Sequence, residues 1–421
     1  MNESGLRKLE WQRLDLSARE YQESPFEAFG RLRSQGPVVR ARFPLIGKVW
    51  SVTTYAAVED VLKNDKLFCR DPRNAGRKFV MFQVILQTLW PSVFRRLMQN
   101  MISMDEPDHR RLRSLVDQAF QRQGVTELRP RIEDLVDVEL DRVEELAAQN
   151  GGEVDLVEHL ARPVPLAVIC EVLGLPEDDR PKFKQWFAGF TNAKLSLRGI
   201  LNLLPGLRKC MKYLRGQFET VRKNPQQGLI TLLVQAEQAG DRLNDDELLS
   251  MAMLLLLAGH ETTVHLISNS ILTLLQFPDS RRSLVSDWSQ VESAVEEVLR
   301  YCSPAQIAKP RFVTEDVTFY EQQLKRGEVI VPVLASANLD PLQFEDPGEF
   351  IIDRDPNYHL GFGTGPHVCL GLKLARAETQ IVLKKVFTRW PNLQPAFDPL
   401  RPVWGRRPGM RSPGSLPVRL D

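Results

Sequence analysis

The segment that most constrains this chain is a glycine-rich stretch around one cysteine, which runs directly into a helical pattern. Residues 362–371 read FGTGPHVCLG, and the helical pattern covers Leu372–Trp390. A cysteine close to a helix N-terminus lies beside unpaired backbone N–H groups and the positive end of the helix dipole, which lower the pKa of its thiol. The glycines leave a flat surface on which a large planar ligand can lie. A buried structural cysteine is the ordinary alternative, but the whole pattern favours a binding loop around Cys369.

Composition excludes several classes of protein. The 421 residues include 55 Lys and Arg against 54 Asp and Glu, so the formal net charge of +1 gives no reason to expect a nucleic-acid or anionic-membrane partner. The five cysteines are scattered and lack a CxxC pair, which argues against a disulfide framework and a zinc ribbon. The N-terminus shows no secretory signal, and the most apolar run, 251–259, is roughly half of the ~20 residues that cross a bilayer. We therefore expect a cytoplasmic protein with no membrane span.

The hydrophobic patterns predict a mainly α protein with small β-sheets. Short β-rich runs at 38–43 and 49–53 predict an early hairpin, and a second β-leaning zone covers 311–332. Nearly everything from 105 to 277 has apolar residues at helical spacing. No change in composition separates the two halves, so we expect a single domain over residues 1–421.

The cysteine segment fits F-G-x-G-x-H-x-C-x-G, which resembles the haem-binding loop of the cytochrome P450 superfamily and fixes six positions in ten. Other segments are similar to that family as well. Glu297–Arg300 matches its E-x-x-R helix, and 105–113 matches the D-P-P-x-H-x-x-L-R stretch that opens its C helix. Residues 337–347 resemble the A-N-x-D-P-x-x-F-x-D-P segment of bacterial members. The matches run from about residue 20 to the end, so the resemblance implies the cytochrome P450 fold for nearly the whole chain.

The E-x-x-R pair is structural in that family. Glu297 and Arg300 are three residues apart, which places both on one helix face where they can pair. On the resemblance, Arg354 completes a buried Glu–Arg–Arg network that serves folding rather than chemistry.

The resemblance implies a haem b cofactor, iron protoporphyrin IX, whose iron is bound by the thiolate of Cys369. A thiolate ligand pushes electron density toward the iron and favours cleavage of the O–O bond. Phe362 would pack near the thiolate. Gly363, Gly371 and Ala258 would lie against the haem.

The same resemblance implies a set of haem propionate ligands. His109 and Arg113 are four residues apart and would lie on one helix face, suited to two oxygens of a propionate. Arg311 and His367 would complete the set. The interval that leads to Arg311 is about one residue longer than is usual, which leaves Lys309 less securely placed.

A second motif lies in the long helical stretch from 245 to 277. Gly259 interrupts a run of good helix formers, at a cost of about 1 kcal/mol relative to Ala, so the helix accommodates something close to it. Residues 258–263 read AGHETT and resemble the family's A-G-x-[DE]-T-T, where the central helix bulges over the haem to make room for dioxygen.

On that resemblance Thr262 hydrogen-bonds the reduced oxygen and Glu261 relays protons to it from solvent. The alternative for both side chains is a solvated polar face on a buried helix. We expect three histidines, His260, His159 and His265, to be structural.

The resemblance implies a monooxygenase that inserts one atom of O2 into a hydrophobic small molecule, such as a terpenoid, fatty acyl chain, steroid or polyketide. Two alternatives stay open. One is a family member that does not hydroxylate, either peroxide-driven or a coupling oxidase, and the pair Glu261–Thr262 counts against the peroxide route. The other is a haem sensor or carrier without turnover, which usually has an output domain that is not visible here.

No flavin or Fe–S motif follows the haem-binding loop, so we expect electrons from a separate ferredoxin and ferredoxin reductase. A basic cluster of Arg110, Arg111 and Lys373 would dock an acidic ferredoxin, although a merely solvated face is the alternative. Between 77 and 100 the chain is unusually apolar. Its large apolar side chains would either line a hydrophobic substrate cavity or pack between helices. They are Phe79, Phe82, Leu86, Leu89 and Phe94.

Overall fold

The structure is a computed structural model that describes residues 12–44, 46–76, 100–191, 197–238, 243–405, 407 and 409–420. This part of the chain is mainly α-helical with small sheets, so the predicted fold class is confirmed. The α-helices are α1 (Arg19–Glu23), α2 (Pro25–Arg33), α3 (Tyr55–Lys63), α6 (Asp108–Gln123), α7 (Val125–Gln149), α8 (Pro163–Leu173), α9 (Arg180–Thr191), α10 (Leu197–Lys223), α11 (Leu229–Gln238), α12 (Asp245–Gln276), α13 (Pro278–Ser286), α14 (Val291–Tyr301), α15 (Leu334–Ala337) and α16 (Leu372–Arg389).

Three small sheets accompany these helices in the described residues. Their strands are β1 (Gln12–Arg13), β2 (Val38–Phe43), β3 (Gly47–Val52), β4 (Phe68–Cys69), β5 (Glu153–Asp155), β6 (Arg311–Val313), β7 (Val317–Phe319), β8 (Gln322–Leu324), β9 (Val329–Pro332), β10 (Gln394–Pro395) and β11 (Pro417–Arg419). The strand orders are β1-β2-β3-β9-β6-β4, β10-β11-β5 and β7-β8.

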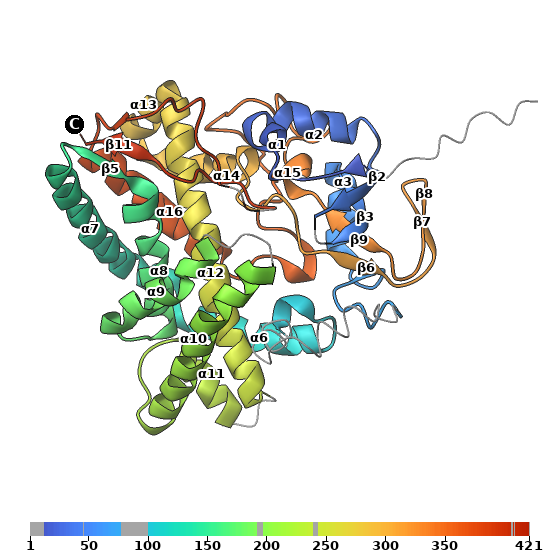
Figure 1. Ribbon diagram of the computed structural model, residues 1–421, viewed down its shortest axis with the longest axis horizontal. Helices are drawn as coiled ribbons and strands as arrows, with labels where there is room; N and C mark the ends of the chain where they lie inside the picture. The colour runs from blue at the N-terminus through green and yellow to red at the C-terminus, as the bar shows by residue number, and fades with distance from the viewer. Residues whose placement is uncertain are drawn as a thin grey trace, which may run out of the picture.

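Both predicted β regions are confirmed. The early hairpin is the antiparallel pair β2–β3, in register from Val38 opposite Val52 to Phe43 opposite Gly47. The second β zone contains β6 to β9, and β9 joins β3 and β6 in the largest sheet. Figure 1 shows this sheet with α1, α2 and α3 on one side of the molecule, and the long helices on the other.

Helix α12 is the central helix of the protein. Asn244 caps it, because its side-chain oxygen accepts a hydrogen bond from the N–H of Glu247 at 2.9 Å and the carboxylate of Glu247 accepts one from the N–H of Asn244 at 3.0 Å. Most of its own residues are buried, many of them apolar, and a helix that is apolar on all sides is stable when it lies in the core. In Figure 1 it runs through the middle of the helical half.

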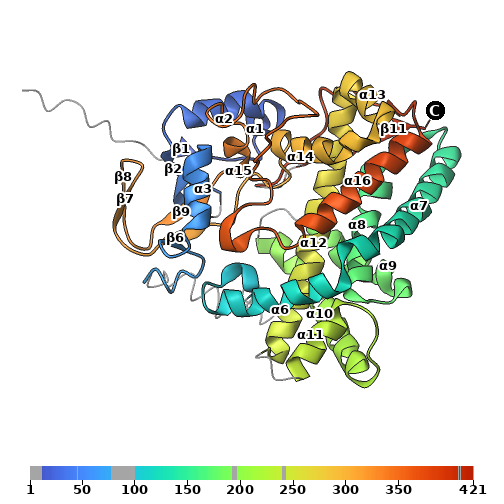
Figure 2. The same cartoon turned by 180° about the vertical axis from the view of Figure 1, so that it is seen from behind.

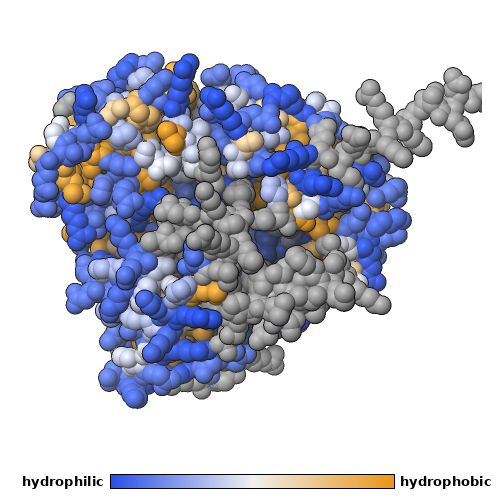
Figure 3. Space-filling view, in the orientation of Figure 1, coloured by the Kyte–Doolittle hydropathy of each residue, from blue (hydrophilic) through white to orange (hydrophobic). Residues whose placement is uncertain are grey.

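The length and apolar character of α12 would also suit a membrane span. Among the described residues it is a helix long and apolar enough to cross a membrane, but 61% of its most apolar stretch is buried inside the protein. Figure 3 shows a mainly hydrophilic face with hydrophobic side chains in small separate groups. Helix α12 therefore behaves as a core helix.

Helix α16 follows the cysteine loop and packs against α7, α12 and α14. Figure 2 shows α16 and α7 side by side, with the loop that leads into α16 lying above α6. The loop is thus held between the sheet side, through α3, and the helical half of the molecule.

The predicted Glu–Arg–Arg network is confirmed. The carboxylate of Glu297, which is fully buried, accepts hydrogen bonds from Arg300 Nε at 2.8 Å and Nη2 at 2.7 Å. Arg354 Nε donates to the same carboxylate at 3.1 Å, as do the N–H of Ile351 at 3.0 Å and the amide of Asn357 at 3.0 Å. Because every oxygen lone pair has a donor, the buried charge is compensated, and the network ties α14 to the segment before the cysteine loop.

Removing the acid from this network leaves two arginines without a buried counter-charge. We expect Glu297→Ala to lower the free energy of unfolding by about 3–5 kcal/mol, as is typical when one partner of a buried ion pair is lost. Urea denaturation measures this. Glu292→Ala, at an exposed position of the same helix, is the control, and equal stability of the two variants would contradict the prediction.

Candidate active site

The cysteine loop has a tightly specified backbone. Cys369 N–H donates to the carbonyl of Phe362 at 2.9 Å, which closes the loop over a short 3-10 turn at Gly365–His367. Gly363 and Gly365 have φ values of 69° and 73°, in the left-handed region. A Cβ at Gly365 would lie 2.5 Å from the carbonyl oxygen of Leu62 in α3, so only glycine fits there.

Open space lies beside this loop. A Cβ placed on Gly363 or Gly371 would meet no atom within 4 Å. The ring of Phe362 packs under the guanidinium of Arg376, 4.8 Å from the ring centre, and that guanidinium is held by the carboxylate of Glu296. Two glycines of the loop therefore border open space, as the predicted glycine-lined surface requires.

The expectation that the loop lowers the pKa of Cys369 is wrong for the protein without a ligand. Burial raises this pKa above its usual range, and a hydrogen bond from the N–H of Gly371 with the charges of Arg113 and Arg376 opposes it only in part. Cys369 lies ahead of Gly371, the N-cap of α16, so it is outside the first helical turn. A bound metal cation deprotonates a coordinating thiol outright, which is the further positive charge that this thiol needs.

A cluster of buried basic side chains lies next to the cysteine loop, and we call it the cation cluster. Its members, linked by ring contact or mutual charge effects, are Arg70, His109, Lys309, Arg311 and His367. The rings of His109 and His367 have centroids 3.9 Å apart. Arg311 donates to the carbonyls of Leu62 at 3.0 Å and Phe68 at 3.3 Å.

The cation cluster is short of negative charge. Burial lowers the pKa of Arg70 to about 9, of Lys309 to about 8 and of Arg311 to about 10, and for the first two a neighbouring arginine adds to the effect. Burial and the surrounding cations lower the pKa of His367 to about 2, and burial also lowers that of His109. The Nε atoms of Arg70 and Arg311 are buried and have no hydrogen-bond partner.

Asp105 is the carboxylate that acts on all three of these strong cations, and it already has donors. Its oxygens accept from the N–H of Arg70 at 2.6 Å, the N–H of Asp71 at 2.9 Å and the amide of Asn74 at 2.7 Å. With both imidazoles neutral, the three cations outnumber the acids that act on them, Asp105 and, at Arg311, Asp65, so the cluster keeps a net positive charge. Haem carries two propionates, so the charge and the orphaned donors of the cluster fit that cofactor.

The structure brings three of the four predicted propionate ligands into the cation cluster and places the fourth, Arg113, beside it, where its charge acts on His109. His109, Arg311 and His367 belong to the cation cluster, whereas Arg113 donates to the carbonyl of Val368 at 2.7 Å and to Asp117 at 3.0 Å. Arg113 therefore fixes α6 to the cysteine loop.

Sequence reasoning missed two members of the cluster. Arg70 follows β4 and belongs to no motif, so nothing in the sequence pointed to it. Lys309 lies in the lengthened interval before Arg311, where it donates to the hydroxyl of Ser103. Its spacing of two from Arg311 was the available signal.

On the other side of the site, α12 carries the AGHETT motif without interruption. The predicted bulge is absent, because all residues from Asp245 to Gln276 are α-helical. Thr262 Oγ1 donates to the carbonyl of Ala258 at 2.7 Å, and both residues are exposed. Close packing explains the glycine at position 259, since a Cβ there would lie 3.0 Å from Cδ1 of Ile169 in α8.

The acid of this motif is held by the C-terminal part of the chain. Glu261 forms an ion pair with Arg407, and its Oε1 lies 3.8 Å from Nε2 of His265. His260 pairs through Nε2 with the carbonyl of Arg162 at 3.1 Å, which fits the structural role expected of it. Burial lowers the pKa of His265 to about 3, so this imidazole is neutral beside the acid.

The predicted basic docking cluster is reduced by ion pairs. Arg111 pairs with Glu247 of α12 at 2.6 Å and with Asp108 at 3.2 Å, so it joins two helices. Arg110 is exposed and lies 2.9 Å from Glu106, and Lys373 is exposed. The residues Phe79, Phe82, Leu86, Leu89 and Phe94, expected to line a substrate cavity, lie outside the described residues.

Comparison with known proteins agrees with this geometry. A family model described as Cytochrome P450 matches residues 21–393. The chain is 36% identical over 409 residues to the cytochrome P450 monooxygenase PikC of Streptomyces venezuelae, covering 96% of this chain and 94% of the relative. It is 36% identical over 407 residues to the polyketide biosynthesis cytochrome P450 PksS of Bacillus subtilis (strain 168), covering 96% and 97%. A solved myxobacterial cytochrome P450 in complex with myristic acid superposes with a TM-score of 0.86 at 35% identity, over 96% of this chain and 98% of that one.

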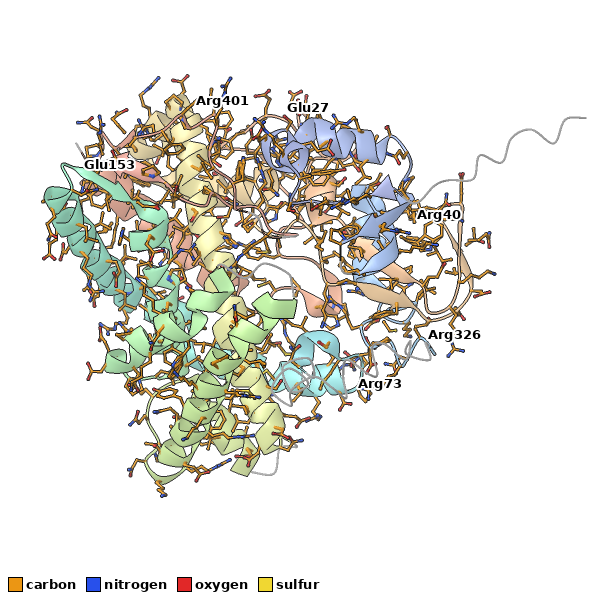
Figure 4. The ribbon with its side chains drawn as sticks, viewed as in Figure 1. Glu27, Arg40, Arg73, Glu153, Arg326 and Arg401 are labelled. Atoms are coloured by element: carbon orange, nitrogen blue, oxygen red, sulfur yellow. The ribbon has the colours of Figure 1, made fainter. Side chains whose placement is uncertain are left out.

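The cation cluster predicts which side chains retain haem. We expect Arg70→Met to release haem about tenfold faster or more, because a charged donor to a carboxylate is lost. Transfer of haem to an excess of apomyoglobin measures the rate. Arg73→Met is the matched control, since this arginine of the same loop is 79% exposed and points outward in Figure 4. Equal release from both variants would show that Arg70 does not contact the cofactor.

Lys309 predicts a pH dependence of haem affinity. Its pKa of about 8 without ligand would rise beside a propionate, so above about pH 8 haem binding takes up a proton. The affinity should then fall with rising pH, by up to about tenfold per pH unit. Haem transfer followed from about pH 7 to about pH 8.5 should show this in the wild type and in Lys373→Met, and not in Lys309→Met, in which Arg70 and Arg311 lose protons only at higher pH. A slope that survives in Lys309→Met would assign the proton to another group.

Proposed function

The chain belongs to the cytochrome P450 family of haem monooxygenases, and we propose that it inserts one oxygen atom of O2 into a hydrophobic small molecule. One observation carries the proposal: a single-cysteine loop with open space beside it adjoins a net positive cluster of buried cations with unpartnered donors, which suits the carboxylates of a cofactor. We propose that residues 1–421 act as one domain, since the two sides of the site come from segments spread along most of the chain.

We assign the cofactor as haem b. Cys369 would bind the iron, and Phe362, Gly363, Gly371 and Ala258 would border the macrocycle. The cation cluster would hold the propionates together with Arg113, which lies beside His109 and also fixes the loop.

When bound, haem on a cysteine thiolate supplies the redox chemistry that activates O2 with two electrons. The chain supplies proton handling. Because the hydroxyl of Thr262 gives its proton to the carbonyl of Ala258, its oxygen is left as an acceptor on the exposed side of α12. It can therefore hold a proton donor, such as a water molecule, at the oxygen-binding space. Glu261 is the next residue along the helix, and its side chain is 22% exposed, so it can carry protons between solvent and that position.

The substrate is proposed to be of terpenoid, fatty acyl, steroid or polyketide type. Relatives are named for polyketide biosynthesis, vitamin D(3) 25-hydroxylation and biotin biosynthesis, and these names support a hydrophobic ligand without choosing one.

We propose that a ferredoxin and its reductase supply the electrons. The exposed side chains of Arg110 and Lys373, near the cysteine loop, would contact an acidic partner. The five free cysteines and the burial of α12 support a cytoplasmic location.

The role of Thr262 is testable by coupling. We expect Thr262→Ala to consume NAD(P)H in the presence of redox donors but to form roughly tenfold less product per electron pair, releasing hydrogen peroxide instead. Thr263→Ala is the control, because Thr263 makes the same kind of hydrogen bond, to the carbonyl of Gly259 at 3.0 Å, on a buried face. Product and peroxide are quantified for both variants, and unchanged coupling in Thr262→Ala would rule out the proposed proton role.

A further inference from the structure

An ion pair joins the C-terminal tail (residues 396–420) to the oxygen side of the site. The guanidinium of Arg407 contacts the carboxylate of Glu261, next to Thr262 on α12. The two side chains are 25% and 22% exposed, so the pair borders accessible space instead of lying sealed in the core. In the view of Figure 1 the tail, in dark red, crosses the upper part of α12.

The tip of the tail also reaches the segment that carries the cation cluster. Met410 pairs with Ala305 in an isolated β-bridge, and the carbonyl of Gly409 accepts a hydrogen bond from the N–H of Gln306 at 2.8 Å. A Cβ on Gly409 would lie 2.9 Å from Cγ1 of Ile307. Arg407 is therefore held between the AGHETT motif and the stretch of chain that leads to Arg311.

This position creates a conflict for the acid. A carboxylate that carries protons between solvent and Thr262 has to leave the guanidinium that holds it. When the ion pair separates, the partly buried guanidinium of Arg407 loses the negative charge that Glu261 provides in the resting protein. Loss of such a partner is costly unless another anion takes its place. A planar guanidinium binds carboxylates through two parallel N–H groups, so a second carboxylate is the best replacement.

We propose that Arg407 is an anion-binding residue of the substrate pocket and that the substrate is a hydrophobic acid, whose carboxylate exchanges with Glu261 on Arg407. The inference rests on the monooxygenase function proposed above and narrows its substrate class. Binding of the acid then has two effects: it anchors the apolar chain of the substrate, and it frees Glu261 for proton transfer.

The test is a titration of the ferric holoprotein with myristic acid and with methyl myristate, following the Soret band as it shifts from low spin to high spin. The two ligands share one apolar chain and differ in charge. We expect the wild type to bind the acid about tenfold more tightly than the ester, the gain typical of a charge-assisted hydrogen bond.

Two substitutions should then move the affinity for the acid in opposite directions. Arg407→Gln should weaken acid binding by about tenfold and leave ester binding unchanged. Glu261→Gln removes the competing carboxylate and should tighten acid binding. Arg401→Gln is the matched control, because Arg401 lies in the same tail, is 89% exposed and points outward in Figure 4. It should change neither affinity.

Several outcomes would overturn the inference. One is equal affinity of the wild type for acid and ester. Another is a loss of both affinities in Arg407→Gln, or a loss of acid affinity in Glu261→Gln, since either would make the ion pair merely structural. A wild type that binds neither ligand also counts against it, because myristic acid has both required features, an apolar chain and a carboxylate.

Failure of the underlying function would show in a different measurement. The preference for the acid is recorded before any electron is supplied, whereas monooxygenation requires donors and O2. A protein that prefers the acid but forms no oxygenated product from any bound ligand would contradict the proposed function and leave the anion site standing.

Discussion

Burying positive charge without a counter-ion costs free energy, and the cofactor side of this protein is arranged around that cost. Arg70 follows β4, an edge strand of the largest sheet, and Arg311 lies in the neighbouring strand β6, whereas His109 comes from helix α6 in the helical half. A ligand with two carboxylates would compensate charges supplied by both halves at once. Binding of such a cofactor would therefore also stabilise the association of the two halves, since a ligand that binds only the folded state stabilises that state.

The Glu297 network shows the opposite solution to the same problem. There a buried carboxylate meets two arginines and further donors, so the charges are compensated within the chain and need no ligand. The two groups differ in this respect: the charges of the Glu297 network are compensated within the chain, whereas Arg70 and Arg311 of the cation cluster each keep a buried Nε without a hydrogen-bond partner.

Short-range patterns predicted much of the fold and part of the site. Helix α12 and the β2–β3 hairpin follow from hydrophobic periodicity, which is a local property. The E-x-x-R spacing predicts the pairing of Glu297 with Arg300, because residues three apart lie on one face of a helix. Arg70 could not be found in this way, because Lys309, Arg311 and His367, its other partners in the cation cluster, lie far from it in sequence. The pairing of Glu261 with Arg407 was hidden for the same reason. Burial, which no spacing reveals, reversed the expected direction of the Cys369 pKa.

Helix α6 has contacts on both sides of the site. Arg113 holds the carbonyl of Val368 beside the thiol, and Arg111, two residues earlier, holds Glu247 in the capping turn of α12. Arg110, which directly precedes Arg111 in the same helix, is exposed to solvent. Because α6 is tied both to the loop that carries Cys369 and to the first turn of α12, a displacement of α6 would be transmitted to both sides of the site.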